Sequence, residues 1–346
     1  MVKICVVGAG VIGLSSALRI IELHPEAEVV VIADKFSPGT TSDVSGGFWE
    51  PHLLGDTPQE KIRKWSSKTF EHMSWLANTD CAKYTGTCMV SGYQMSSDPN
   101  TEAPFWKDQV KNFRVLSQDE MKQYEDMKFG FFYTTVKLES QMYLQWLMKR
   151  VQRLGGRLKK QRINTFEELA DGNYAVIINC TGVGARQLAN DSSVQPVRGQ
   201  VIRVIAPWIT MHYDFQDRHG KDFYIFPGSN YVVLGGVEHH GDWNTEVSTS
   251  DKKLIWDNCT KYLPSLTEAV IDSDCVGLRP ARPSVRLEIE HIDVKGKIMP
   301  VIHNYGHGGA GVTLHWGCAE EVSHLITDLL RQDKTMLKSK TELAKL

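Results

Sequence analysis

Apolar residues follow two different periods in the first 34 residues of this chain. "KICVVGAG" at 3–10 has the pattern of a short buried strand that runs into a glycine turn. "VIGLSSALRIIEL" at 11–23 places apolar residues, Ile20 and Ile21 among them, at helical spacing. "EVVVIAD" at 28–34 is a second, almost wholly apolar strand, typical of a parallel sheet covered on both faces. The opening segment therefore predicts a βαβ unit.

The pattern then changes twice along the chain. Residues 55–135 are rich in Trp, Tyr, Lys and Asp and show no clear rhythm of parallel strands. "YLQWLMKRVQRLGG" at 143–156 predicts a helix that ends at glycine, and "YAVIINCTG" at 174–182 predicts another buried strand. Between about 200 and 285, runs such as "QVIRVIA" and "YVVLGGV" alternate like antiparallel strands. A last strand, a glycine loop and a closing helix complete the chain.

This order of elements predicts an α/β chain (α+β overall) built from two interleaved domains. We expect a Rossmann-like, nucleotide-binding domain assembled from 1–55, 140–197 and 285–346. A mostly antiparallel sheet domain should fill the gaps with 56–139 and 198–284. The length of 346 residues fits this division, because single cores rarely grow so large.

Composition and charge narrow the class of protein. Hydrophobic residues make up 42% and charged residues 23%, and the formal net charge is −2, so neither nucleic acid nor an acidic membrane is expected as a partner. No run of 18 apolar residues and no signal peptide are found. The seven cysteines are widely spaced without a CxxC pair, which predicts reduced thiols and neither a disulfide framework nor a metal site.

The glycine pattern after the first strand predicts a dinucleotide site. Gly8, Gly10 and Gly13 form G-x-G-x-x-G between a strand and a helix. The first glycine permits the tight turn, the second lets a pyrophosphate approach the backbone, and the third lets helix and strand pack closely. Asp34 stands about 20 residues further on, where an acid can hold ribose hydroxyls.

A second glycine loop, "YGHGGAGVTLHWG" at 305–317, also precedes a predicted helix. Such a loop presents backbone N–H groups and a positive helix end to a negative atom. A flavin needs this at the pyrimidine end of its ring, because reduction places negative charge there. An NAD enzyme has less need of a second loop. The pair of loops therefore favours FAD over NAD.

At this point the chain resembles the D-amino-acid oxidase and D-aspartate oxidase family of flavoenzymes. The resemblance spans nearly the whole length. It is carried by "VVGAGVIGLSSA", "DKFSPGTTSDVSGGFWEPH", "FRVLSQDEM", "NCTGVGARQLANDSSVQPVRGQV", "YIFPG", "LGGVEHHGDWN", "GLRPARPSVRLE" and "HNYGHGGAGVTLHWGCAEE".

The resemblance implies an oxidase that deaminates D-amino acids to 2-oxo acid, ammonia and hydrogen peroxide, with O2 as the second substrate. It implies that Arg279 grips the substrate carboxylate, since a guanidinium donates two parallel hydrogen bonds, and that the Tyr224 hydroxyl shares this carboxylate. His307 is expected to be structural, because direct hydride transfer needs orientation more than a base. Together with the first loop, the implied FAD contacts are Gly8, Gly10, Val11, Ile12, Gly13, Asp34, Lys35, Thr41, Ser42, Gly46, Gly47, Ile163, Thr181, Gly308, Gly309, Ala310, Gly311, Val312 and Thr313.

The sequence departs from the family pattern where the substrate side chain is expected. Glu50 stands where the enzymes for neutral substrates carry Gln. The expected lid loop at 211–223 lacks their lid tyrosine and carries Arg218, close to where the D-aspartate enzymes place an arginine for the second carboxylate. Their other such arginine falls at Glu238, which should repel a carboxylate. We expect acidic D-amino acids, D-aspartate first, with Arg218 as their partner; neutral D-amino acids are the alternative.

The last three residues, "AKL" at 344–346, lie one step from the peroxisomal address "SKL". They predict the peroxisomal matrix as the location and its import receptor as a partner. A homo-oligomer stays open. Two other classes, an NAD-dependent dehydrogenase and a flavin-binding protein without catalysis, also stay open at this point. A yellow flavin spectrum separates the first from an oxidase, and peroxide release with D-amino acids separates the second.

Overall fold

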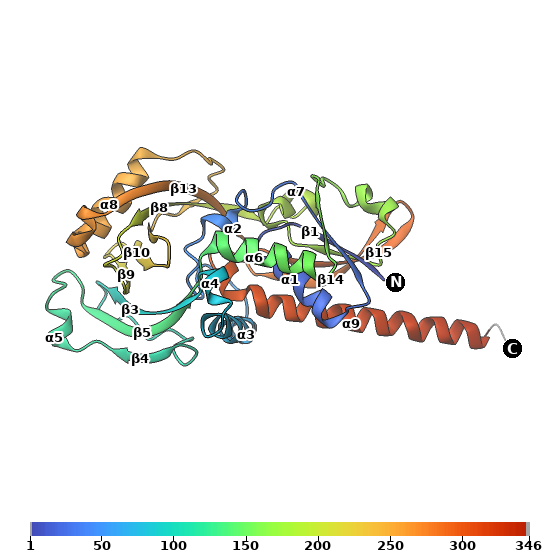
Figure 1. The fold of residues 1–346 in the computed structure, drawn as a ribbon, viewed down its shortest axis with the longest axis horizontal. Coiled ribbons are helices and arrows are strands. Elements are labelled where there is room, and N and C mark those ends of the chain that lie inside the picture. The colour runs from blue at the N-terminus through green and yellow to red at the C-terminus, as the bar shows by residue number, and fades with distance from the viewer. Residues whose placement is uncertain (1, 344–346) are drawn as a thin grey trace.

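The computed structural model describes residues 2–343 of the chain and the side chains of residues 2–331. Two sheets lie side by side, each with its own covering of helices, and helix α9 extends beyond the body of the molecule (Figure 1). The expected α/β class is confirmed. The tail at 344–346, on which the peroxisomal prediction rests, lies outside the described residues.

The first sheet has six strands in the order β14-β15-β7-β1-β2-β6. Its central strands pair in parallel, while β14 and β15 form an antiparallel edge. The strands are β1 (Lys3–Val7), β2 (Glu28–Ala33), β6 (Arg157–Lys160), β7 (Val176–Asn179), β14 (Arg286–Val294) and β15 (Lys297–Tyr305). β1, β2 and β7 are buried almost throughout, which explains why they consist of apolar residues instead of alternating ones.

The second sheet has nine strands, eight of them in the order β12-β8-β11-β10-β9-β3-β5-β4, with β13 paired to β8. All its pairs are antiparallel except β3 with β9. The strands are β3 (Cys88–Ser96), β4 (Lys111–Val115), β5 (Phe129–Lys137), β8 (Gln195–Ile205), β9 (His212–Gln216), β10 (Asp222–Pro227), β11 (Val232–Gly235), β12 (His239–His240) and β13 (Val270–Ala281).

Helices cover the sheets and connect them. The α-helices are α1 (Val11–Leu23), α2 (Thr41–Val44), α3 (Gln59–Ala77), α4 (Ala82–Thr85), α5 (Gln118–Met121), α6 (Ser140–Arg153), α7 (Ala185–Leu188), α8 (Thr249–Tyr262) and α9 (Gly311–Leu343). Three short 3₁₀ helices are η1 (Phe166–Gly172), η2 (Gly182–Gly184) and η3 (Pro264–Glu268). Within the described part, no helix is both long and apolar enough to cross a bilayer.

The segment 211–223, which we expected to be a loop, is a β-hairpin instead. β9 and β10 pair in antiparallel register, and only a short turn joins them, closed by a hydrogen bond from Asp217 N to Lys221 O at 2.8 Å. The many polar residues suggested a loop. However, Tyr213, Phe215 and Phe223 fill the apolar contacts of a sheet, and Phe215 and Phe223 are buried there. The division into two domains with this segment as a lid stays a prediction.

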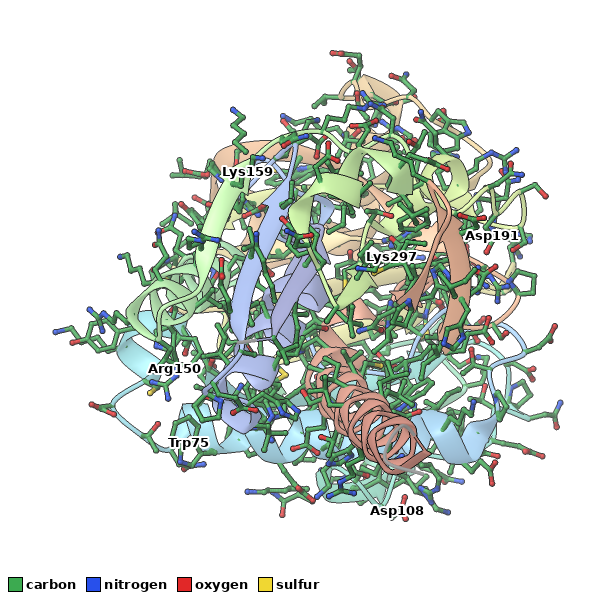
Figure 2. All side chains as sticks on the ribbon, turned by 90° about the vertical axis from the view of Figure 1, so that its right-hand side faces the viewer. Trp75, Asp108, Arg150, Lys159, Asp191 and Lys297 are labelled. Atoms are coloured by element: carbon green, nitrogen blue, oxygen red, sulfur yellow. The ribbon has the colours of Figure 1, made fainter. Side chains whose placement is uncertain are left out.

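Helix α9 packs against both α1 and α3 beneath the first sheet. Figure 2 looks toward the end from which α9 projects, with Lys159 and Lys297 extending outward from the sheet above it. Contact with α3 is close, because the backbone N–H groups of Trp316 and Gly317 both donate to Thr69 Oγ1 at 3.2 Å. A Cβ on Gly317 would overlap the backbone of Trp65.

We therefore expect Gly317→Ala to destabilise the protein by about 1–3 kcal/mol, the scale of an overpacked core. The measurement is the free energy of unfolding in urea. His324→Ala, on the exposed side of the same helix, is the matched control and should change it by less than about 0.5 kcal/mol. Equal effects of the two variants would contradict the close contact.

Candidate functional site

A cavity of about 1460 Å³ lies between the two sheets. The carboxyl ends of β1, β2 and β7 open into it on one side, and β8, β10 and β13 of the second sheet line it on the other. Ligand sites in α/β sheets occur at this edge of the strands. The volume exceeds the roughly 300–1,000 Å³ of an ordinary small-molecule site, so a dinucleotide and a small substrate can share the cavity.

The first glycine loop forms one end of this cavity. Gly8 adopts a positive φ of 111°, and a Cβ there would overlap the carbonyl of Cys180. The N–H of Val11, the first residue of α1, donates to Ser42 Oγ at 3.0 Å, which ties α2 to the helix start. Gly13 does not line the cavity; a Cβ there would overlap the carbonyl of Gly8, so this glycine lets α1 pack onto the loop.

The second glycine loop reaches the same cavity from the far end of the chain. Gly308 has a positive φ of 53°, and a Cβ there would overlap the carbonyl of Leu53. Its N–H donates to the carbonyl of Pro280 at 2.9 Å, which joins the loop to β13. Gly309 and Gly311 line the cavity, and α9 begins at Gly311. Two helix starts separated by about 300 residues in sequence thus open toward one ligand site.

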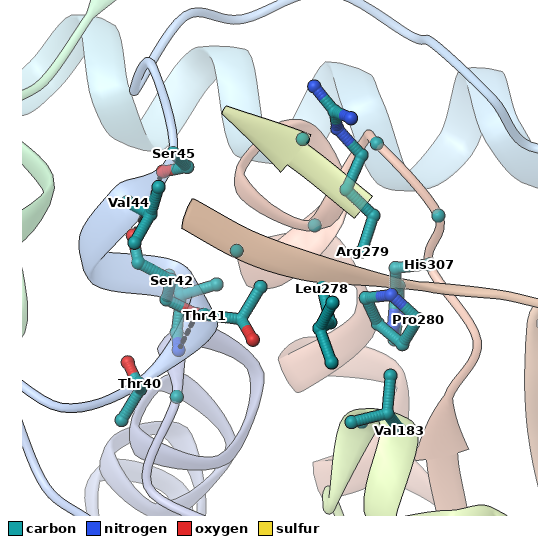
Figure 3. A pocket seen from close by; sticks show the side chains of 18 of the residues that line it. Thr40, Thr41, Ser42, Val44, Ser45, Val183, Leu278, Arg279, Pro280 and His307 are labelled. Carbon is teal, nitrogen blue, oxygen red and sulfur yellow. Dashed lines mark hydrogen bonds between the residues drawn. The ribbon is translucent and has the colours of Figure 1, made fainter. Parts of the chain in front are cut away.

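Arg279 and Tyr224 approach the cavity from different strands of the second sheet, and bare glycines make room for both. Arg279 on β13 lies across Gly199 of β8, where any Cβ would collide with its guanidinium. Tyr224 on β10 lies across Gly235 of β11, where a Cβ would collide with its ring and hydroxyl. Arg279 Nη1 donates to the carbonyl of Val237 at 3.3 Å. Figure 3 shows Arg279 on its strand, across the cavity from α2.

The state of the Tyr224 hydroxyl follows from this position. Burial raises the pKa of Tyr224, and the charge and hydrogen bond of Arg279 lower it only in part, so the hydroxyl keeps its proton. The ring stacks on Phe226 at 4.3 Å, and Phe226 stacks on Phe48 at 4.0 Å. Tyr224 is therefore a fixed neutral donor beside a fixed cation.

Acidic side chains line the part of the cavity next to Tyr224. Gln94 Nε2 donates to Glu50 Oε1 at 3.0 Å, and burial raises the pKa of Glu50 to about 7. Burial also raises the pKa of Asp214 well above its usual range, and the charges of Glu50 and Asp222 add to this effect. Asp222 lines the cavity as well. Three carboxyl groups thus share one end of the site.

A fourth carboxylate in this region has a cationic partner. Glu238 Oε1 and His52 Nε2 lie 2.8 Å apart. Burial lowers the pKa of His52, but its hydrogen bond with Glu238 and the charge of Glu50 outweigh burial and raise the pKa. This pair neutralises Glu238, the acid that departs from the family pattern.

The structure also places Arg218 and His307, the two other residues discussed in the sequence analysis. Arg218 is exposed at the turn of the β9–β10 hairpin, donates to His219 Nε2 at 3.2 Å, and does not line the cavity. Its predicted contact with substrate therefore stays a prediction without geometric support. His307 lines the cavity; burial lowers its pKa to about 3, and its Nε2 has no hydrogen-bond partner among the described residues.

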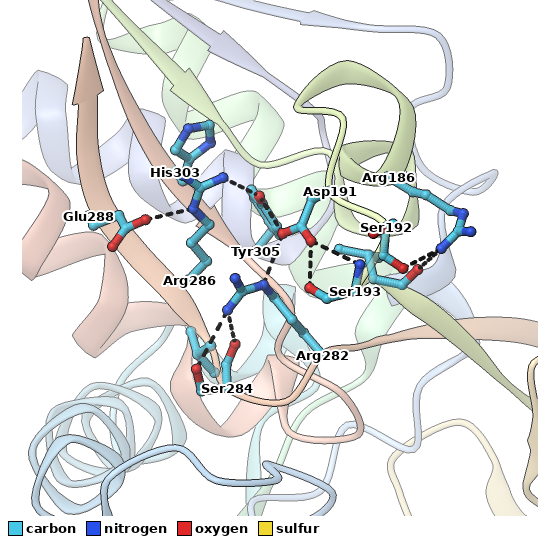
Figure 4. Close-up of polar contacts among 12 residues, drawn as sticks. Arg186, Asp191, Ser192, Ser193, Arg282, Ser284, Arg286, Glu288, His303 and Tyr305 are labelled. Carbon is cyan, nitrogen blue, oxygen red and sulfur yellow. Dashed lines mark hydrogen bonds and ion pairs between the residues drawn. The ribbon is translucent and has the colours of Figure 1, made fainter.

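A polar network holds the strand that carries Arg279. Asp191, in the turn before β8, accepts hydrogen bonds from Arg282 Nε and from the hydroxyl of Tyr305, both at 2.9 Å (Figure 4). Burial raises the pKa of Asp191, but hydrogen bonds from Ser193, Arg282 and Tyr305 outweigh it and hold the pKa at about 2. The network thus links the end of β13 with the end of β15, from which the second glycine loop departs.

Comparison with known proteins identifies the family. Residues 3–325 match the family described as FAD dependent oxidoreductase. The chain is 42% identical to D-aspartate oxidase of Homo sapiens, over 96% of this chain and 97% of that one. It is 37% identical to D-amino acid oxidase of Dugesia ryukyuensis, over 96% and 99% of the two chains. The chain belongs to this family of FAD-dependent oxidoreductases.

Solved structures of other oxidases share the fold of this chain. Glycine oxidase from Geobacillus kaustophilus superposes with a TM-score of 0.73, covering 96% of this chain and 95% of that one, at 16% identity. L-alpha-glycerophosphate oxidase from Mycoplasma pneumoniae with FAD bound gives a TM-score of 0.71 over 94% and 95%, at 14% identity. The fold and the FAD-dependent class expected from the sequence are confirmed.

The cavity residues fit the flavin cofactor of the family. Glycines keep side-chain atoms away from both helix starts, and His307, which lines the cavity, leaves its buried Nε2 without a hydrogen-bond partner among the described residues. No cluster of His, Cys, Asp or Glu among the described residues could hold a metal ion. Of the expected FAD contacts, Gly13, Ala310 and Thr313 do not line the cavity, and those that do are Gly8, Gly10, Val11, Ile12, Asp34, Lys35, Thr41, Ser42, Gly46, Gly47, Ile163, Thr181, Gly308, Gly309, Gly311 and Val312.

Sequence reasoning missed several residues of the site. Gly199 and Gly235 were not singled out, although each makes room for a side chain of the expected substrate grip. His52, Asp214 and Asp222 were missed as cavity residues. Asp222 could have been found, because it stands two residues before Tyr224 on one strand and so shares its face.

Gly235→Ala should displace Tyr224 and lower kcat/KM for any accepted D-amino acid by about 10-fold or more, the scale of one misplaced hydrogen-bond donor. The flavin absorbance per protein should stay near that of the unchanged enzyme. Tyr224→Phe gives the reference: if Gly235 acts through Tyr224, the double variant falls no further than Tyr224→Phe alone. Additive losses would contradict this link.

Proposed function

We propose that the protein catalyses FAD-dependent oxidative deamination of D-amino acids. The products are a 2-oxo acid, ammonia and hydrogen peroxide, with O2 as the electron acceptor. The supporting observation is the placement of Arg279 and Tyr224, which come from separate strands and converge in the cavity that the two glycine loops close. The relatives named D-aspartate oxidase and D-amino acid oxidase support the same reaction.

In this proposal the chain binds and orients the substrate. Arg279 receives the α-carboxylate through two parallel hydrogen bonds, and the protonated Tyr224 hydroxyl donates a third. Holding the carboxylate at two places fixes the rotation of the Cα–H bond, which is the main requirement of a direct transfer. The bound flavin supplies the acceptor for that hydride. His307 is neutral and buried, so its role in the proposal is structural.

The site identifies the substrate's side chain less directly than it identifies the reaction. The 42% identity to human D-aspartate oxidase supports acidic D-amino acids, and neutral ones are the alternative. However, Arg218, the residue assigned from the sequence to a second carboxylate, lies outside the cavity. Four carboxyl groups, Glu50, Asp214, Asp222 and Glu238, line the part of the cavity near Tyr224. The sequence identity to D-aspartate oxidase favours an acidic side chain, whereas the carboxyl groups in the cavity disfavour one. Peroxide release with a panel of acidic and neutral D-amino acids distinguishes the two.

Arg279→Lys tests the proposed grip on the carboxylate. An ammonium cannot reproduce two parallel hydrogen bonds, so kcat/KM should fall by about 30- to 1000-fold, the scale of one charge-assisted contact. Flavin content should not change. Arg153→Lys, on the exposed side of α6, is the matched control and should keep normal kinetics. Near-normal kcat/KM in Arg279→Lys would refute the assigned role.

We further propose that the protein enters the peroxisomal matrix through its last three residues, 344–346. A peroxide-forming oxidase fits an organelle equipped to destroy peroxide. A fluorescently tagged protein that lacks the three residues should stay in the cytosol, whereas the full chain should co-localise with a peroxisomal marker. Import of the truncated protein would show that the address lies elsewhere.

A further inference from the structure

The wall of the cavity next to Tyr224 is unusually acidic for a site that holds a carboxylate substrate. Asp214 on β9 pairs directly with Tyr224 on β10, and Asp222 stands two residues before Tyr224 on the same strand. Directly paired residues and residues two apart share a face of a sheet. Both carboxyl groups therefore share the face of the sheet that presents Tyr224, and both line the cavity, as does Glu50.

The Asp214 side chain has no partner among the described residues. Its side chain is only 8% exposed, yet it has no hydrogen bond or ion pair within the described residues. A buried carboxylate without a partner is costly, and native structures rarely leave one unexplained. Since Asp214 lines the cavity, the missing partner has its place inside the cavity.

The cations near this wall are already engaged or in solvent. His52 pairs with Glu238 at 2.8 Å, and His239 Nε2 lies 3.0 Å from Asp251 Oδ1. Lys221 borders the cavity on the exposed side of the hairpin turn. Arg279 is reserved for the α-carboxylate in the proposed reaction. No cationic side chain of the described residues therefore neutralises Asp214.

The neighbouring acids, Glu50 and Asp222, also lack a cationic partner in the described part of the chain and are hydrogen-bonded to neutral amides instead. Gln94 Nε2 donates to Glu50 at 3.0 Å, and Gln216 Nε2 donates to Asp222 at 3.0 Å. These amides are neutral, so they do not balance the charge of the carboxyl groups when a bound cation favours their ionised form. A second substrate carboxylate would meet three carboxyl groups here, and an apolar side chain would leave Asp214 without a partner.

We propose that this wall, with Asp214 at its centre, selects D-amino acids whose side chain carries a positive charge, as in D-lysine, D-ornithine or D-arginine. The inference rests on the proposed function and specifies its substrate class. The side-chain cation supplies the donor that Asp214 lacks, and Glu50 and Asp222 add attraction. Arg279 holds the other end of the same molecule, so the site matches a carboxylate at one end and a cation at the other.

The test compares D-lysine with D-norleucine, which has the same carbon chain and no side-chain charge. We expect kcat/KM for D-lysine to exceed that for D-norleucine by about 10-fold or more, the scale of one charge-assisted hydrogen bond. Asp214→Asn should remove most of this ratio. Asp257→Asn, which removes an exposed acid on α8, should leave the ratio unchanged.

A binding experiment separates the wall from the reaction. 6-Aminohexanoate is D-lysine without its α-amine and cannot be oxidised, and hexanoate lacks the distal ammonium too. Calorimetric titration of the flavin-loaded enzyme should show tighter binding of 6-aminohexanoate than of hexanoate, and Asp214→Asn should reduce that difference.

The outcomes distinguish this inference from the proposed function. A preference for D-aspartate or D-norleucine over D-lysine in the unchanged enzyme overturns the inference and leaves the oxidase function standing. Absence of peroxide with every D-amino acid, together with normal flavin content, overturns the function itself. The comparison of D-lysine with D-norleucine needs only the unchanged enzyme, so it decides the matter even where Asp214→Asn fails to fold.

Discussion

One backbone hydrogen bond connects the two halves of this active site, from the N–H of Gly308 to the carbonyl of Pro280 at 2.9 Å. Gly308 belongs to the loop that starts α9, and Pro280 directly follows Arg279 on β13. The loop can approach so closely only because no Cβ stands between Gly308 and the carbonyl of Leu53. The position of Arg279 relative to the second glycine loop therefore depends on backbone contacts that no residue larger than glycine permits at position 308.

The polar network around Asp191 supports that junction. Arg282 and Tyr305 reach Asp191 from the two strands that flank the junction, and Arg286 donates to the Tyr305 hydroxyl at 2.8 Å. Hydrogen bonds to a charged group are stronger than neutral ones, and this carboxylate stays ionised well below neutral pH. The redox loop and the substrate strand are thus held together by both backbone packing and charge.

The cavity is also divided into regions whose lining groups differ in charge. In the proposed reaction, helix starts and glycine N–H groups hold the cofactor and Arg279 provides a cation for the α-carboxylate, while carboxyl groups line the remaining wall. Glu238, which alone argues against an acidic substrate in the sequence, turns out to be paired with His52. The carboxyl group without a partner among the described residues is instead Asp214, so Asp214 and not Glu238 is the residue on which specificity depends in our proposal.

Family resemblance predicted the roles of Arg279 and Tyr224. Local patterns in the sequence determined the βαβ start, both glycine loops and the FAD-dependent class. These features depend on short-range constraints: a positive φ at Gly8, a helix start, and a motif whose residues lie close together in the chain. Only the tertiary structure decided that 211–223 is a hairpin, that Arg218 lies outside the cavity, and that Asp214 lines it. The register between strands that are far apart in sequence sets which side chains share a face of the sheet. A one-residue shift of β9 would move Asp214 to the other face. For the same reason the gaps at Gly199 and Gly235 acquire a meaning only once their neighbouring strands are known.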